Sequence, residues 1–184
     1  LGSKEARYAE QAIQGMNDVI ERCGQVQALA DQKISVEWTK CHLNELLGEV
    51  IERCREPGRV VLDCDPALMI KSDLKLLKII FANLIDNAIK YGALKGPVKV
   101  TAELDGKKVC IVVSNRAHKA RMPDPALVFT KYYRAPWAHE QVGSGLGLYL
   151  ISQLSKILDG ELRYLPKDQE VNFKLCLKPS TSSL

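Results

Sequence analysis

The 184-residue sequence lacks any apolar run approaching the ~18 residues that a membrane-spanning helix needs, so it predicts no such helix. Its first residues also lack the apolar stretch of a secretion signal, and we expect a soluble protein. Cys-x-x-Cys pairs and histidines at zinc-ligand spacing are missing, which excludes the common zinc motifs. We expect reduced, mostly buried thiols of a cytosolic protein at Cys23, Cys41, Cys54, Cys64, Cys110 and Cys176.

Concentrated positive charge is also missing. The net charge is +4, with 12 Lys and Arg against 14 Asp and Glu in residues 1–91, and 14 against 8 in residues 92–184. This excess is too small and too spread for a nucleic-acid partner, but it suits a small anionic ligand such as a polyphosphate. The length fits one ordinary domain with an appendage.

Residues 6–34 contain no proline and carry apolar side chains at steps of three and four, interrupted only by Gln27, which predicts a long amphipathic helix. This stripe consists of Ile13, Met16, Ile20, Cys23, Ala30 and Ile34. Because its apolar face is wide, we expect the helix to pack against a partner helix or a second copy of the chain.

Strand and helix patterns alternate in the rest of the chain. We expect strands at 35–41, 59–64, 98–104, 109–113, 160–165 and 171–177, and helices at 42–54, from Ser72 or Asp73 to 91, and from the glycines at 143–147 to 158. Residues 115–143 have three prolines and no apolar periodicity, which favours a lid or binding segment. This order predicts an α+β fold with one mixed sheet and helices on a single face.

The run Gly143-Ser144-Gly145-Leu146-Gly147-Leu148 opens the last helix. Glycines allow close backbone approach, and the first amides of a helix are unpaired donors, so such a run can bind phosphate. The alternative is a turn that only packs the helix against the sheet. A dinucleotide-binding motif fits less well, because a long lid rather than a strand precedes the glycines.

A polar ridge lies on the predicted helix that ends near residue 91. Asn83, Asn87 and Lys90 are four and three residues apart, so they share one helix face. An amide oxygen suits Mg²⁺ and a lysine can meet phosphate charge, whereas the alternative is an ordinary solvated face. We expect Asp86 to point elsewhere, toward the surface.

Three motifs together resemble the N box, F box and G2 box of the ATP-binding domain of bacterial sensor histidine kinases. They are Asn83-x-x-x-Asn87-Ala88-x-Lys90-Tyr91, the lid segment 129–134 and the glycine run 143–148, in the family's order and spacing. The resemblance covers roughly residues 36–178 and implies a two-layer α/β sandwich of the GHKL, or Bergerat, type. It implies an N-terminal helix at 1–34 that is the second helix of a dimerisation and phosphotransfer hairpin, and an ATP-binding kinase domain at 35–178. The Ser-rich tail at 179–184 is expected to be frayed.

The resemblance implies ATP and Mg²⁺ as ligands and a role for each matching residue. Asn87 matches the Mg²⁺-binding asparagine, and Asn83 and Lys90 complete the implied catalytic set. Tyr132 matches the packed aromatic of the lid, and Arg134 matches the arginine near the phosphates. The full implied ATP-binding set is Asn83, Asn87, Lys90, Tyr91, Asn115, Tyr132, Arg134, Gly143, Ser144, Gly145, Leu146 and Gly147.

One box departs from the family pattern. Where the family has an Asp-x-Gly-x-Gly segment, residues 114–120 read Ser-Asn-Arg-Ala-His-Lys-Ala, with Asn115 at the position of the adenine-reading aspartate. An amide oxygen still accepts a hydrogen bond, but without the assistance of a charge. The change predicts weaker affinity, altered base choice or a silenced site.

The function implied by the resemblance is transfer of the ATP γ-phosphate to a histidine on a dimerisation helix outside this fragment, in the same or a partner protomer. Neither His42 nor the lid residues His118 and His139 resembles that acceptor, so the fragment alone should not autophosphorylate. A homodimer, a downstream response regulator and a cytoplasmic domain on an inner-membrane parent are implied too. The alternatives are a pseudokinase binding module and a gyrase-type ATPase clamp, although the amide of Asn83 is a poor base for the latter.

Overall fold

A computed structural model describes residues 6, 13, 16, 17, 20, 21, 23–31, 34–94, 96–117, 122–138 and 143–178. Its elements are β1 (Thr39–His42), α2 (Leu43–Glu52), the 3₁₀ turn η1 (Pro57–Arg59), β2 (Val60–Cys64), β3 (Met69–Ser72), α3 (Leu74–Tyr91), β4 (Val98–Asp105), β5 (Lys108–Arg116), η3 (Pro136–Ala138), α4 (Gly147–Ile157), β6 (Glu161–Tyr164) and β7 (Glu170–Leu177).

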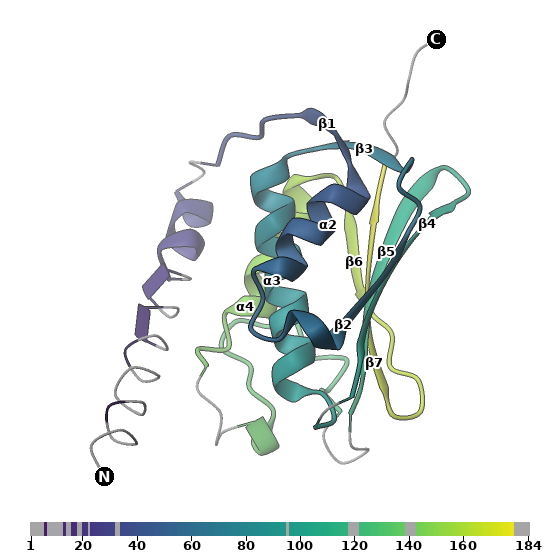
Figure 1. Cartoon of the computed structure of the whole chain (residues 1–184). Helices are drawn as coiled ribbons and strands as arrows, with labels where there is room; N and C mark the ends of the chain where they lie inside the picture. Colours follow the sequence, from purple (N-terminus) through teal and green to yellow (C-terminus); the bar gives the residue numbers. More distant parts are fainter. Residues whose placement is uncertain are drawn as a thin grey trace.

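The main sheet has five strands in the order β2-β4-β5-β7-β6. The β2 and β4 strands are parallel, while the other neighbours are antiparallel, so the sheet is mixed as predicted. Figure 1 shows α2, α3 and α4 together on one face of this sheet. The structure therefore confirms the expected two-layer α/β sandwich.

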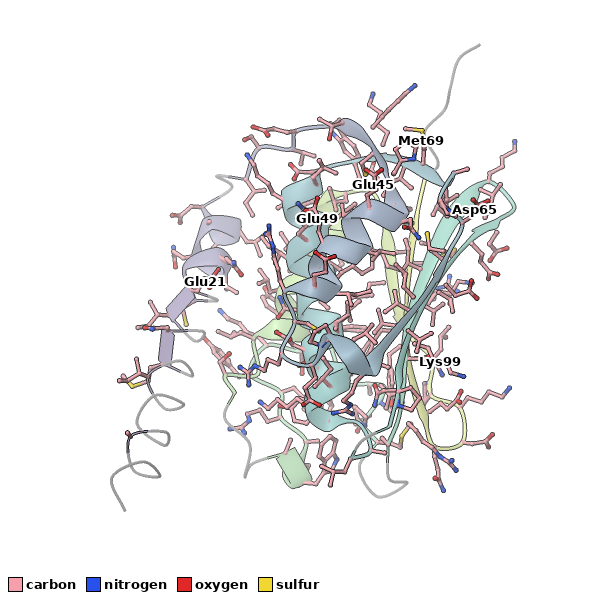
Figure 2. All side chains as sticks on the ribbon, in the orientation of Figure 1. Glu21, Glu45, Glu49, Asp65, Met69 and Lys99 are labelled. Carbon is pink, nitrogen blue, oxygen red and sulfur yellow. A yellow bond between two sulfur atoms is a disulfide. The ribbon has the colours of Figure 1, made fainter. Side chains whose placement is uncertain are left out.

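The core lies between α3 and the inner face of the sheet. Alternate residues of β5, including Ile111 and Val113, are fully buried because a strand turns every second side chain to the same face. From α3 they meet Leu77, Ile80, Phe81, Leu84 and Ile85, all at most 1% exposed. The other sheet face is polar, and Figure 2 shows Lys99 pointing away from the helices.

The predictions were wrong at the start of the domain. The β1 strand covers Thr39–His42 instead of 35–41, and it pairs with an unpredicted strand, β3, in a separate two-stranded sheet. The β3 sequence is only Met-Ile-Lys-Ser, which is too short for a period-2 pattern to stand out. His42 ends β1, although the sequence placed it in the following helix.

The expectation of six reduced cysteines was also wrong. Cys110 and Cys176 lie at directly paired positions of β5 and β7, and the structure joins them in a disulfide. A sequence separation of 66 residues concealed this pairing, because only the strand register brings the two side chains together. The described thiols of Cys41 and Cys64 are free, and burial raises the pKa of both, which makes them poorly reactive.

Of the predicted N-terminal stripe, Ile34 packs against the core, while Cys23 and Ala30 are exposed. Residues 23–30 are helical, and Val26 and Leu29 pack partly buried against the core. By contrast, Ile13, Met16 and Ile20 are 59–66% exposed. Figure 1 shows this purple segment running beside the domain, and its assignment as a separate unit stays a prediction. Within the described ranges, no helix has the length and hydropathy needed to cross a bilayer.

The start of α3 depends on Asp73, one of the two capping residues that the sequence allowed. Its Oδ1 accepts hydrogen bonds from the amides of Lys75 at 2.9 Å and Leu76 at 3.0 Å, and its Oδ2 accepts one from the amide of Glu37 at 2.8 Å. Asp73 is only 3% exposed, so these amides have little access to water as a replacement partner. The side chain thus caps α3 and ties it to the segment before β1.

We expect Asp73→Ala to lower the free energy of unfolding by about 2 kcal/mol, the upper end for loss of an N-cap, because three amides lose their acceptor. Urea unfolding under non-reducing conditions measures this. Asp73→Asn keeps an acceptor oxygen at the cap and should lose clearly less. Equal stability of the alanine variant and the unchanged chain would show that the cap does not stabilise α3.

Candidate functional site

A cleft of about 1180 Å³ opens between α3, the lid segment and the glycine run that precedes α4. The helix α3 therefore shares one cavity with the lid and the glycine run, which lie much later in the sequence. It is lined by ten of the twelve residues in the predicted set: Asn83, Asn87, Lys90, Tyr91, Asn115, Arg134, Gly143, Ser144, Gly145 and Gly147.

The polar face of α3 forms one wall of the cleft. Asn83 is 8% exposed, and its Nδ2 donates a hydrogen bond to the carbonyl of Ile79 at 2.9 Å. Its Oδ1 is buried and has no hydrogen-bond partner among the described residues. Because a buried unpaired oxygen is costly, this atom is suited to accept a ligand, a metal ion or a water molecule.

The glycine run forms a second wall, at the N-terminus of α4. A Cβ atom on Gly143 would lie 3.4 Å from the Lys90 Nζ, so the lysine ammonium reaches the run. Leu146 occupies the N-cap position of α4, which begins at Gly147. Its apolar side chain has no atom that could accept hydrogen bonds from the first amides of the helix. Backbone donors and a cation are thus gathered at one end of the cleft, an arrangement that favours an anion.

Gly145 brings the glycine run against the lid. It has a φ of +70°, and a Cβ atom there would lie 2.7–2.9 Å from the backbone of Tyr132. The amide of Tyr132 donates a hydrogen bond to the carbonyl of Gly145 at 3.1 Å. Only glycine fits this conformation and this contact without displacing the lid.

Two residues of the predicted set lie outside the cleft. Tyr132 has a φ of 65° and is 64% exposed, while the adjacent Tyr133 lines the cavity and accepts a hydrogen bond from the Asp124 amide at 3.1 Å. The sequence could not distinguish these two tyrosines, since the turn at Tyr132 decides which ring points inward. Leu146 is 2% exposed and belongs to the interior.

Part of the cleft lining is apolar. Ala88, Val171 and Phe173 line it, together with Asn115, which is 7% exposed. Phe173 stacks on Tyr164 with ring centroids 5.1 Å apart. Burial raises the pKa of Tyr164 to about 12, so the hydroxyl of this tyrosine, which stacks on Phe173, stays neutral.

Sequence reasoning missed two features of the cleft. Asp86 lines it rather than facing outward, and its position three residues after Asn83 and four before Lys90 could have indicated this shared face. Trp137, for which no site role was predicted, packs edge-on against Tyr91 with ring centroids 5.6 Å apart and lines the cavity.

Charge in the cleft favours an anionic ligand. Its lining has five basic residues, Arg53, Arg55, Arg59, Lys90 and Arg134, against three acidic ones, Glu21, Glu56 and Asp86. Lid positions 118–121 and 139–142, which include His118 and His139, lie outside the described residues.

Comparisons with known proteins identify the family of the chain and several relatives. The family described as "Histidine kinase-, DNA gyrase B-, and HSP90-like ATPase" matches residues 72–181, more than half of the chain. Among curated proteins, the sensor protein CreC of Escherichia coli is 33% identical over 108 residues, covering 58% of this chain and 21% of CreC. The sensor-like histidine kinase SenX3 of Mycobacterium tuberculosis is 25% identical over 171 residues, covering 88% of this chain and 42% of SenX3.

A solved structure, the mycobacterial sensor histidine kinase MprB, is similar with a TM-score of 0.65 at 22% identity, over 78% of this chain and 98% of that chain. This likeness shows the fold alone. The chain spans less than half the length of the two curated relatives. The family match shows that the chain belongs to the histidine kinase-, DNA gyrase B- and HSP90-like ATPase family, and its relative SenX3 is a sensor-like histidine kinase.

Proposed function

We propose that the cleft binds Mg·ATP and that the chain is the catalytic part of a protein histidine kinase. The single observation that carries this proposal is the convergence of the α3 ridge, the lid and the glycine run on one cavity. Backbone donors of the glycine run with the nearby Lys90 suit a triphosphate, and the apolar lining residues suit a purine.

The residues present fit a Mg²⁺ ion that takes some of its ligands from the protein and others from the phosphates. The Asn83 Oδ1 is unpaired, and Asn87 lines the cleft one helical turn further on. Within the described ranges, no group of three or more His, Cys, Asp or Glu side chains could hold a metal by itself. Mg²⁺ typically takes few protein ligands and completes its shell with substrate phosphates and water. Asn87 is therefore the proposed metal ligand, and the bound ion would neutralise phosphate charge.

The proposed roles of the remaining residues follow from where they lie. The amides of the glycine run and the Lys90 ammonium would bind the phosphates. Arg134, whose Nη2 donates to the Ala138 carbonyl at 2.7 Å, would approach the phosphates when the lid closes. Catalysis in this design is positioning and charge neutralisation, since phosphoryl transfer needs little covalent help from the protein.

The acceptor histidine is proposed to lie on a helix of the same or a partner protomer, in a homodimeric parent that passes the phosphate to a response regulator. The exposed side chains of Ile13, Met16 and Ile20 support pairing with another helix. A cytoplasmic position in a membrane-attached parent stays a prediction. A gyrase-type ATPase is disfavoured, because the Asn83 amide cannot take a proton from water.

Phosphotransfer from labelled ATP tests this function. We expect the chain to bind Mg·ATP in calorimetry and to label a separately supplied dimerisation helix that carries a histidine, giving an acid-labile, base-stable product. The same helix with the histidine replaced by glutamine is the control and should stay unlabelled, as should the chain alone. ATP binding without any transfer would favour the pseudokinase, whereas millimolar ATP without binding would refute the site.

A further inference from the structure

Asn115 is a buried polar side chain in an apolar part of the cleft. It lies near the end of β5, opposite Val171 of β7, and Ala88 of α3 and Phe173 are further neighbours in the lining. Its side chain packs against Gly92, where a Cβ atom would come within 3.2 Å of the Asn115 Nδ2 and would also collide with the Ala88 carbonyl. An apolar lining with one buried amide fits the edge of a planar heterocycle.

The amide of Asn115 is only weakly held in its present orientation. Its Nδ2 donates a hydrogen bond to the carbonyl of Arg116 at 3.4 Å, beyond the usual range of 2.7–3.2 Å. Among the residues that the structure describes, none donates a hydrogen bond to its Oδ1. A half-turn of the amide would exchange the two atoms at the loss of a single long hydrogen bond.

A carboxamide can pair with either of two purine edges. Toward a 6-aminopurine, Oδ1 accepts from the amino group and Nδ2 donates to ring N1. Toward a 6-oxopurine, the turned amide donates from Nδ2 to O6 and accepts at Oδ1 from the N1 proton. A carboxylate at the same place has acceptors only, so it would repel O6.

We propose that Asn115 lets this site bind 6-oxopurine nucleoside triphosphates as well as 6-aminopurine ones. This inference rests on the proposed function, because it concerns the base end of the same cleft. It assigns Asn115 as the residue that sets base selectivity. It also predicts that a carboxylate at position 115 would make the site prefer the 6-aminopurine.

The test compares dissociation constants for ATP, ITP and GTP with Mg²⁺, measured by calorimetry on the whole chain. ITP differs from ATP only at the pairing edge, while GTP adds a 2-amino group. We expect the unchanged chain to bind ITP within about 5-fold of ATP, and Asn115→Asp to widen this ratio to at least about 30-fold, the size expected when a buried polar edge is mispaired.

Asn172→Asp is the matched control. Asn172 lies on β7 away from the cleft, where its Nδ2 donates to the Leu165 carbonyl at 3.1 Å, so the variant introduces the same charge without touching the base. Its ITP to ATP ratio should equal that of the unchanged chain. Asn115→Leu removes both pairing atoms and should weaken both nucleotides while keeping their ratio within about 5-fold.

Two results would overturn the inference alone: rejection of ITP by the unchanged chain by more than about 50-fold while ATP binds, or an unchanged ratio in a folded Asn115→Asp variant. The measurement on the unchanged chain decides the matter even if that variant fails to fold. Absence of binding by all three nucleotides would instead refute the proposed function, and the inference with it. ITP binding with GTP rejected supports pairing at position 6 and shows that the 2-amino group is excluded.

Discussion

Asn87→Ala should weaken Mg·ATP binding by about 100-fold or more, which takes it out of reach of a millimolar titration. The amide is the proposed Mg²⁺ ligand, and water cannot hold the ion at the same fixed place on α3. The fold should be unaffected, because Asn87 lines the cleft and makes no hydrogen bond with another described residue. Calorimetry with Mg·ATP measures the first effect, and thermal unfolding measures the second.

Asn172→Ala is the control for the loss of an asparagine side chain from the domain, and it should bind Mg·ATP normally. A titration of ATP in the presence of EDTA adds a sharper comparison. Without the metal, ATP should bind the unchanged chain and the Asn87→Ala variant with equal affinity. Unchanged Mg·ATP affinity in Asn87→Ala would remove the assignment of the metal ligand. A large drop in the unfolding temperature would show that the residue is structural.

Gly145→Ala is expected to weaken both the fold and the site. A φ of +70° is unfavourable for alanine, and the new Cβ would lie 2.7 Å from the Tyr132 carbonyl carbon. The lid and the glycine run must then move apart, so we expect a loss of about 2–4 kcal/mol in the free energy of unfolding. ATP affinity should fall at least about 10-fold, because the phosphate-binding amides lose their position.

Gly48→Ala is the matched control for this substitution. Gly48 lies within α2, and a Cβ atom there would meet nothing within 4 Å. Alanine in a helix interior should therefore stabilise the chain by about 0.5–1 kcal/mol and leave ATP binding unchanged. If both glycine variants behaved alike, the close approach between Gly145 and the lid would have no energetic importance.

Local patterns were sufficient for the parts of the site that lie on one regular element. The spacing of Asn83, Asn87 and Lys90 placed them on one side of α3, because helix geometry repeats every 3.6 residues. The strands expected at 98–104 and 109–113 form the β4–β5 hairpin, which turns at Asp105-Gly106 with the left-handed conformation that glycine tolerates, φ +60° at Gly106. In each case the controlling interactions are only a few residues apart.

Other features depend on contacts between segments that are distant in the sequence, so no local pattern predicts them. The inward direction of Tyr133 rather than Tyr132 follows from the lid backbone at the Gly145 contact. The Cys110–Cys176 bond follows from strand register, and β3 forms because β1 is available as a neighbour.

By itself, the sequence determined the class of fold, the family resemblance and the polar face of α3, since periodicity and motif spacing are properties of the chain alone. The tertiary structure alone decided which residues share the cleft, because that depends on how β5, β7, the lid and α4 pack around α3. The place of Asn115 in an apolar pocket, with a loosely held amide, is also a product of that packing. The chemistry of each side chain can be read from the sequence. The distances between site residues and the burial of their side chains arise only when separate segments pack together and exclude water.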